Sequence, residues 1–164
     1  MTETSDAEFF ASLPATRGSA GGLIRSTTGA VLLVRRAYRA DGRWGIPGGI
    51  MEHAESPLAA CGREIAEELG VPAHPLRLAV VDWMPPAPPR TAALHWLFRV
   101  EVSSTDFTLP PEELSAWEWV PPERLAAYLS TGAARRMAAA VRVDDRGSGP
   151  VYLENGHPVL AQER

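Results

Sequence analysis

Three glutamates fall within about one turn of an expected helix, where they could together bind a metal ion. Glu64, Glu67 and Glu68 are spaced i, i+3 and i+4, so they are neighbours on a helix surface. Like charges in this arrangement repel by a few tenths of a kcal/mol per pair, and fold stability gains nothing from them. A hard divalent cation such as Mg²⁺ reverses the sign, because it prefers carboxylate oxygens and shares its other positions with water and phosphates. By itself, the cluster is more typical of a solvated acidic helix face.

The helix that carries these glutamates has clear ends in the sequence. Ser56 is a typical N-cap residue, Pro57 suits the first helical position, and Gly70 terminates the helix after Leu69. One apolar stripe is predicted to face the core, and Gly62 in it would let the helix lie close to a sheet. The members of the stripe are Leu58, Gly62, Ile65 and Leu69.

The residues around the three glutamates strengthen the catalytic interpretation. Gly49 is followed after five residues by Glu55 and after seven more by the run from Arg63 to Val71, Arg-Glu-Ile-Ala-Glu-Glu-Leu-Gly-Val. This spacing resembles the signature of the Nudix hydrolase family at every specified position, and a chance match is on the order of one in ten million. The preceding segment 44–49, Trp-Gly-Ile-Pro-Gly-Gly, also resembles the family's approach to this motif.

The resemblance implies a role for each matching residue. Glu64, Glu67 and Glu68 would bind Mg²⁺, with Mn²⁺ as a substitute, and Glu64 or Glu68 would also accept a proton from water. Partners of metal ligands fix ligand geometry, and loop glycines allow close backbone approach. By the same resemblance, Arg63 and Glu55 would orient the ligands, Gly48 and Gly49 would form the tight loop, and Glu113 would add a carboxylate from a later loop unless it is a solvated loop acid.

Residues for binding the rest of the substrate are less specific in the sequence. Trp44 and Trp83 are candidates for stacking on a base, although packing is the ordinary role of such residues. Arg25 and Arg39, with Arg35 and Arg36 near them, could each bind two oxygens of a phosphate. The alternative is that they are ordinary charged residues on the surface.

The order of expected elements predicts a mixed α/β fold. We expect strands at 21–25 and 30–35, joined as a hairpin by Ser26–Gly29, and further strands at 78–83, 91–102 and 117–120. Helices are expected at 56–69, 121–130 and 133–143, and Asn155-Gly156 predicts a terminal hairpin. The resemblance makes this a Nudix-type α/β/α sandwich with a mixed β-sheet between helices. We expect a flexible lead-in at 1–17, the Nudix domain at 18–145, and a hairpin or tail packed on it at 146–164.

Composition narrows the functional classes. The chain has 164 residues, enough for one domain, and a net charge of −4, which disfavours a nucleic-acid duplex as partner. Its 16 basic residues are all arginine, and the missing lysine excludes a Walker-type phosphate loop and Schiff-base chemistry. One cysteine excludes a disulfide framework and a multi-cysteine zinc site. Without a membrane-length apolar run or a signal peptide, we expect a cytoplasmic monomer or homodimer that has no membrane partner.

The leading functional hypothesis is Mg²⁺-dependent hydrolysis of a diphosphate linkage in a small phosphorylated substrate. The substrate would be a nucleoside diphosphate derivative, namely an ADP-ribose-like molecule, a nucleotide sugar or a nucleoside triphosphate. Pro86 lies fifteen residues after Val71, where ADP-ribose-cleaving members of the family resemble one another in carrying a proline. The alternative is a catalytically silent module that senses a ligand or binds a partner on the same fold. Such modules usually lose motif carboxylates, and here every one is present.

Overall fold

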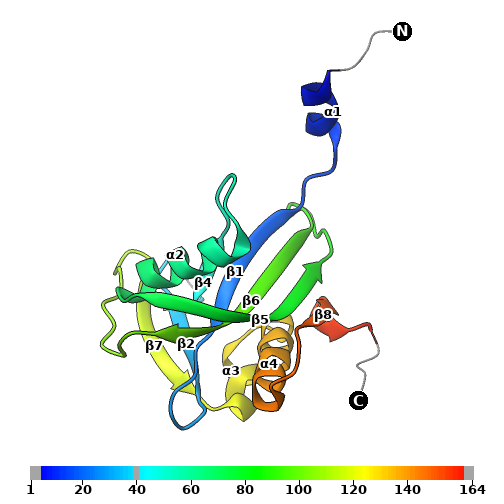
Figure 1. Cartoon of the computed structure of the whole chain (residues 1–164). Helices are drawn as coiled ribbons and strands as arrows, with labels where there is room; N and C mark the ends of the chain where they lie inside the picture. Colours follow the sequence, from blue (N-terminus) through cyan, green and yellow to red (C-terminus); the bar gives the residue numbers. More distant parts are fainter. Residues whose placement is uncertain (1–4, 39–40, 161–164) are drawn as a thin grey trace.

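The computed structural model describes residues 5–38 and 41–160, which form two β-sheets and the helices that pack on them (Figure 1). The larger sheet has the strand order β4-β1-β6-β5-β8-β9, and the smaller one has the order β3-β2-β7. β1 is parallel to β6 and β5 is parallel to β8, whereas the other pairs are antiparallel. The mixed α/β class is confirmed, with two sheets where the sequence predicted one. The strands are β1 (Arg17–Leu23), β2 (Val31–Arg36), β3 (Trp44–Gly45), β4 (Gly48–Ile50), β5 (Ala73–Met84), β6 (Ala93–Val102), β7 (Leu114–Val120), β8 (Val151–Glu154) and β9 (His157–Pro158).

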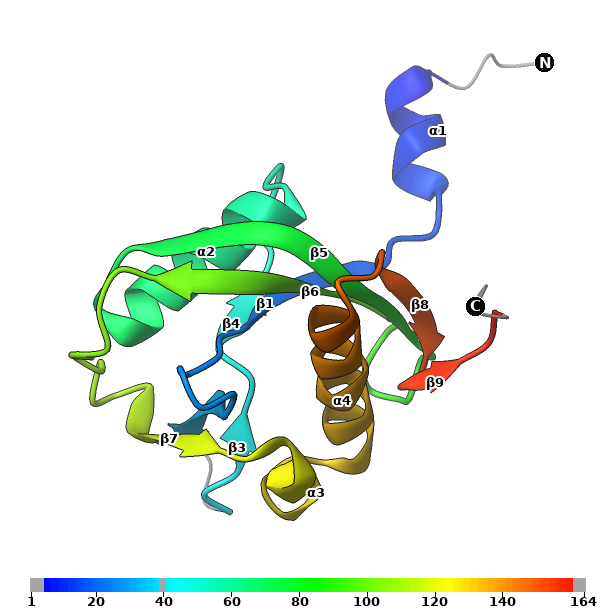
Figure 2. The ribbon, with the colours of Figure 1, turned by 60° about the horizontal axis from the view of Figure 1, so that its bottom comes forward.

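Two helices cover opposite faces of the larger sheet. α2 (Pro57–Leu69) packs on one face and α4 (Thr131–Arg146) on the other, so the β1-β6-β5 strands lie between them (Figures 1 and 2). Each helix buries its own apolar cluster, one around Ile65 and one around Met137. The remaining helices are α1 (Asp6–Ser12), the 3₁₀ helix η1 (Pro122–Arg124) and α3 (Leu125–Tyr128). No helix in the described part of the chain has the length and apolar character needed to cross a membrane.

The ends of α2 follow the sequence prediction. The Ser56 hydroxyl accepts a hydrogen bond from the Ala59 amide at 3.2 Å, Pro57 occupies the first turn, and Gly70 ends the helix with a φ of 68°. The predicted apolar stripe is only half right, because Ile65 and Leu69 are buried but Leu58 is 53% exposed.

The buried face of α2 is rotated away from the predicted stripe. It includes Ala60, Cys61 and the carboxyl-bearing Glu68, so the helix turns a charged residue inward. Gly62 does not serve as a spacer, since a Cβ atom added there would meet its nearest neighbour at an ordinary 3.7 Å. The rotation matters for the site because it buries Glu68, whereas Glu67 stays exposed to solvent.

Three local predictions need correction or extension. Within the lead-in predicted at 1–17, residues 6–12 form the helix α1, because Ser5 and Glu8 cap each other's backbone amides. The Ser26–Gly29 turn is confirmed, and beside it Arg25 and Val31 form an antiparallel bridge as the predicted hairpin requires. The pairing is short, because β1 and β2 then continue into different sheets. The hairpin around Asn155-Gly156 is confirmed, and its strand β8 extends the larger sheet alongside β5.

A buried ion pair joins α4 and the terminal hairpin to the sheet. Asp82 of β5 is completely buried, and its carboxylate accepts hydrogen bonds from Arg136 Nε at 2.8 Å and from the Gly156 amide at 3.0 Å. Arg136 itself lies on α4 and is 8% exposed. One carboxylate therefore holds three separate segments together.

Replacing Asp82 by Asn should destabilise the fold strongly. Asn keeps the shape but leaves the Arg136 guanidinium buried without its counter-charge, which costs about 3 kcal/mol or more. Urea unfolding followed by circular dichroism measures the change. As a matched control, Asp41→Asn breaks the half-exposed pair with Arg43 (3.1 Å) and should cost less than about 1 kcal/mol. Equal losses in the two variants would contradict this role for Asp82.

Candidate active site

The loop that carries Gly48 and Gly49 lies so close to its neighbours that an added Cβ atom at either position would overlap another group. Gly48 has a φ of 128°, and a Cβ atom there would lie 2.3 Å from the carbonyl oxygen of Ala20 on β1. A Cβ atom on Gly49 would lie 2.1 Å from an oxygen of Glu64. The two glycines thus have different functions: one lets the loop pack on the sheet, and the other leaves room for a carboxylate.

Arg63 fixes the segment between this loop and α2. Its Nε and Nη2 atoms each donate to a different oxygen of Glu55 at 2.8 Å, a two-point contact that sets the orientation of both groups. The backbone amide of Glu52 donates to the same carboxylate at 2.9 Å. These bonds, Arg63 first, lower the pKa of Glu55 to about 2, so it stays ionised at neutral pH.

The remaining terminal nitrogen of Arg63 joins two of the three glutamates. Nη1 lies 3.0 Å from Glu64 Oε1 and 3.2 Å from Glu67 Oε2. One cationic nitrogen therefore bridges two carboxylates that would otherwise repel each other. Glu64 is partly buried, whereas the Glu67 side chain is 61% exposed.

Glu68 faces the interior and is held by groups outside its own helix. Its carboxylate accepts a hydrogen bond from the Gly48 amide at 2.8 Å and forms an ion pair with Arg36 of β2. Arg36 also donates to the Gly48 carbonyl at 2.8 Å. Burial raises the pKa of Glu68 to about 7, although Arg36 and the Gly48 amide pull it in the opposite direction.

The three glutamates do not converge on one point in this arrangement. Glu67 faces solvent, Glu64 lies against Gly49, and Glu68 points inward. Across residues 5–38 and 41–160, no set of three or more His, Cys, Asp or Glu side chains is gathered closely enough to hold a metal ion. The sequence predicted that all three glutamates lie on one helix face. In the structure the helix is rotated so that Glu68 is buried and Glu67 is exposed.

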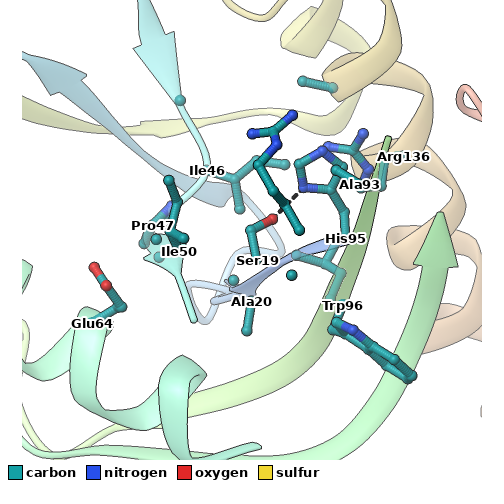
Figure 3. Close-up of a pocket in the computed structure, with 18 of the residues that line it drawn as sticks. Ser19, Ala20, Ile46, Pro47, Ile50, Glu64, Ala93, His95, Trp96 and Arg136 are labelled. Atoms are coloured by element: carbon teal, nitrogen blue, oxygen red, sulfur yellow. Dashed lines mark hydrogen bonds between the residues drawn. The ribbon is translucent and has the colours of Figure 1, made fainter. Parts of the chain in front are cut away.

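A cavity of about 650 Å³ opens beside these groups. Figure 3 shows Glu64 on one side of it, with Pro47 and Ile50 nearby, and His95 and Arg136 on the other side. Arg36, Gly48 and Gly49 also line it, and so does Glu113, the carboxylate predicted to come from a later loop. The volume is in the range of small-molecule sites, so the cavity can hold a nucleotide-sized ligand beside the glutamates.

Other predicted binding residues lie elsewhere. Trp44 packs edge-on against Tyr128 of α3, with ring centroids 5.5 Å apart, and Trp83 lies opposite Leu94 on the neighbouring strand; neither lines the cavity. Arg25 forms ion pairs with Asp144 and Asp145 at the end of α4. Arg39 lies outside the described residues.

The sequence did not single out the polar groups on the far side of the cavity. His95 of β6 shares a hydrogen bond between its Nδ1 atom and the hydroxyl of Ser19 on β1, and Arg136 of α4 lies beside it (Figure 3). Burial, with a further contribution from the Arg136 charge, lowers the pKa of His95 to about 4, so the ring is neutral at pH 7. Only the pairing of the strands brings these residues together, and no spacing along the chain indicates it.

The fold and this constellation define a Nudix-type domain. The NUDIX domain family model matches residues 15–141, which include both the Gly48-Gly49 loop and the whole of α2. The chain therefore belongs to the Nudix family.

Individual relatives place the chain among proteins named for phosphate chemistry. It is 41% identical to 8-oxo-dGDP phosphatase NUDT18 of Danio rerio over 63 residues, 38% of this chain and 19% of that protein. It is 29% identical to phosphatase NudJ of Escherichia coli K12 over 99 residues, 59% of this chain and 63% of that protein. Each match therefore spans less than two thirds of the relative's length. The solved MutT protein of Methanosarcina mazei has 25% identity and a TM-score of 0.65, over 83% of this chain and 98% of that one.

The two loop glycines should respond differently to an added methyl group. Gly48→Ala should cost about 2 kcal/mol or more, because backbone atoms and a positive φ oppose it. Gly49→Ala should cost less than about 1 kcal/mol, since the end of the Glu64 side chain can move aside.

The helix position Gly62 provides the control in the same urea titrations. Gly62→Ala has space and should stabilise the protein by up to about 1 kcal/mol, because alanine is the better helix former. If Gly48→Ala proved no more destabilising than Gly49→Ala, the assigned roles of the loop glycines would be wrong.

Proposed function

We propose that this chain is a metal-dependent hydrolase that cleaves the diphosphate linkage of a nucleoside diphosphate derivative. The observation that carries the proposal is the bridge from Arg63 Nη1 to Glu64, which lines the cavity, and to Glu67. Glu68 is bonded to the amide of Gly48 in the same loop. Three neighbouring carboxylates on one short helix repel one another and do not stabilise the fold. A chemical role therefore explains this cluster better than a solvated acidic surface does. Relatives named as phosphatases support the same reaction class.

The donor set suits a hard divalent cation. Glu64 and Glu67 already share one positively charged nitrogen at 3.0 and 3.2 Å, and carboxylate oxygens are the ligands that Mg²⁺ and Mn²⁺ take. In the proposal Glu64 and Glu67 hold the cation, Glu68 completes the set, and Glu113 adds a carboxylate across the cavity. The bound cation supplies charge neutralisation at the diphosphate.

The protein's own residues supply the remaining requirements of the reaction. Water attacks one phosphorus, the bond to the bridging oxygen breaks, and a phosphorylated fragment leaves. Glu64 or Glu68 accepts the proton of the attacking water, as a carboxylate within reach can. Arg36 and Arg90 line the cavity and offer N–H donors for phosphate oxygens, because one guanidinium can donate to two oxygens at once.

A silent ligand-sensing module on the same fold is the second candidate. It would retain the cavity and its arginines and would need none of the carboxylates. The complete set of Glu55, Glu64, Glu67 and Glu68, with the Arg63 brace intact, favours the enzyme.

Product analysis with a panel of diphosphates tests the proposal. The full chain is incubated with Mg²⁺ and ADP-ribose, nucleotide sugars or nucleoside triphosphates, and mass spectrometry identifies the products. We expect cleavage of at least one compound into a phosphorylated fragment. Glu68→Gln should lower kcat by about 10²- to 10⁴-fold, the usual contribution of a positioned acid–base group.

Glu101→Gln, at an exposed position of β6, is the matched control and should keep full activity. Thermal unfolding of both variants separates loss of chemistry from loss of fold. If the wild type and Glu68→Gln were equally inert over the whole panel, the sensing module would be the better description.

A further inference from the structure

A row of polar residues crosses the larger sheet on the face that α4 covers. Ser19 of β1 is the register partner of His95 on β6, and His95 is in turn the partner of Asp82 on β5. Arg136 reaches this row from α4 and binds Asp82. Asp82 and Arg136 are buried, and Ser19 and His95 are partly buried. Because buried positions are normally apolar, four polar side chains in one place need an explanation.

Two nitrogen atoms of this row are left open to a ligand. Within the described residues, neither His95 Nε2 nor Arg136 Nη1 makes a hydrogen bond, whereas the other polar atoms of the two side chains do. No fully buried side-chain nitrogen or oxygen in the described part of the chain lacks a partner. The two nitrogens are therefore not fully buried, and both residues line the cavity.

The charge of this wall is already balanced, which argues against a phosphate as its ligand. The Asp82 carboxylate at 2.8 Å neutralises the Arg136 guanidinium, and His95 is uncharged at pH 7 because its pKa is about 4. Arg17 is the further cation that acts on His95, but it is exposed and its guanidinium donates to Thr91. In the proposed function, phosphate oxygens bind on the other side of the cavity, near Arg36 and the cation held by the α2 carboxylates.

The same contacts exclude a nucleophilic role for Ser19. A Ser-His-Asp relay needs the carboxylate to bond the imidazole, but both Asp82 oxygens are taken by Arg136 and Gly156. His95 is bonded to Ser19 through Nδ1, which fixes the ring and leaves Nε2 without a hydrogen-bond partner among the described residues. The arrangement orients a hydrogen-bonding edge and does not activate a hydroxyl.

We propose that Ser19, His95 and Arg136 form the wall that recognises the hydrogen-bonding edge of a nucleobase, an inference that rests on the proposed hydrolase function for placing the diphosphate beside Glu64. Arginine can only donate, so the ligand atom that meets Arg136 is an acceptor such as a carbonyl oxygen or a ring nitrogen. His95 Nε2 meets a second atom of the same edge. Ile46, Pro47 and Leu97 supply the apolar cavity lining that a flat ring needs.

Equilibrium binding tests the inference without requiring turnover. Isothermal titration with Mg²⁺ present compares AMP, GMP, CMP and UMP with ribose 5-phosphate, which has the sugar and phosphate but no base. We expect at least one nucleotide to bind the wild type tenfold or more tightly than ribose 5-phosphate. His95→Phe should reduce this preference about tenfold and leave the Kd of ribose 5-phosphate unchanged, as the loss of one desolvated hydrogen bond predicts.

Arg136→Lys is the second variant, because it keeps the charge that Asp82 needs and removes the planar fork. It should reduce the preference by a similar factor. His74→Phe, at an exposed position of β5, is the control and should bind as the wild type does.

The outcomes separate this inference from the proposed function. A wild type that binds ribose 5-phosphate as tightly as every nucleotide, or a preference that survives in either folded variant, overturns the nucleobase wall even if diphosphates are hydrolysed. If both variants lose the base preference but the protein hydrolyses no diphosphate, the nucleobase wall is supported and the proposed hydrolase function is wrong.

Discussion

The guanidinium of Arg36 donates to the carboxylate of Glu68 and to the carbonyl of Gly48, and much of the site depends on these two contacts. They join a strand of the smaller sheet, the glycine loop and α2 at one point. The Gly48 amide closes the set by donating to Glu68 at 2.8 Å. Because a buried carboxylate is costly unless it is paired and hydrogen-bonded, this set admits little other geometry, and it determines where the loop and α2 meet.

From that point the site extends outward through a second arginine. Arg63 binds Glu55 at two points and reaches Glu64 and Glu67 with its last nitrogen, so each acidic group of the motif has a cationic partner. Cations thus hold the carboxylates in place despite their mutual repulsion. The cavity beside them has acidic and basic groups on one side and a charge-balanced polar wall on the other. In our proposal these two sides bind the diphosphate and the base of a nucleotide.

The sequence predicts those parts of the site that lie close together along the chain. The limits of α2 follow from its capping residues, because helix ends are local structures. The loop glycines and the Arg63–Glu55 pair were expected from the resemblance to the Nudix motif. The rotation of α2 toward Glu68 does not follow, since it depends on Arg36, which comes from another sheet. Nor does the Ser19–His95–Arg136 wall follow: strand pairing and α4 bring together residues that are far apart in sequence. Trp44 was predicted to stack on a base because it lies beside the motif in sequence. In the structure it packs against Tyr128.

The central claim is that the acidic face of α2 binds a divalent cation at the cavity. Electron paramagnetic resonance of Mn²⁺ added to the full chain without substrate measures this directly, because free and bound Mn²⁺ give different signals. The account predicts one bound Mn²⁺ per wild-type chain. It also predicts at least tenfold weaker binding for Glu64→Gln, and unchanged binding for Glu101→Gln. Equal Mn²⁺ binding by the wild type and Glu64→Gln, or no bound Mn²⁺ in either, would contradict it.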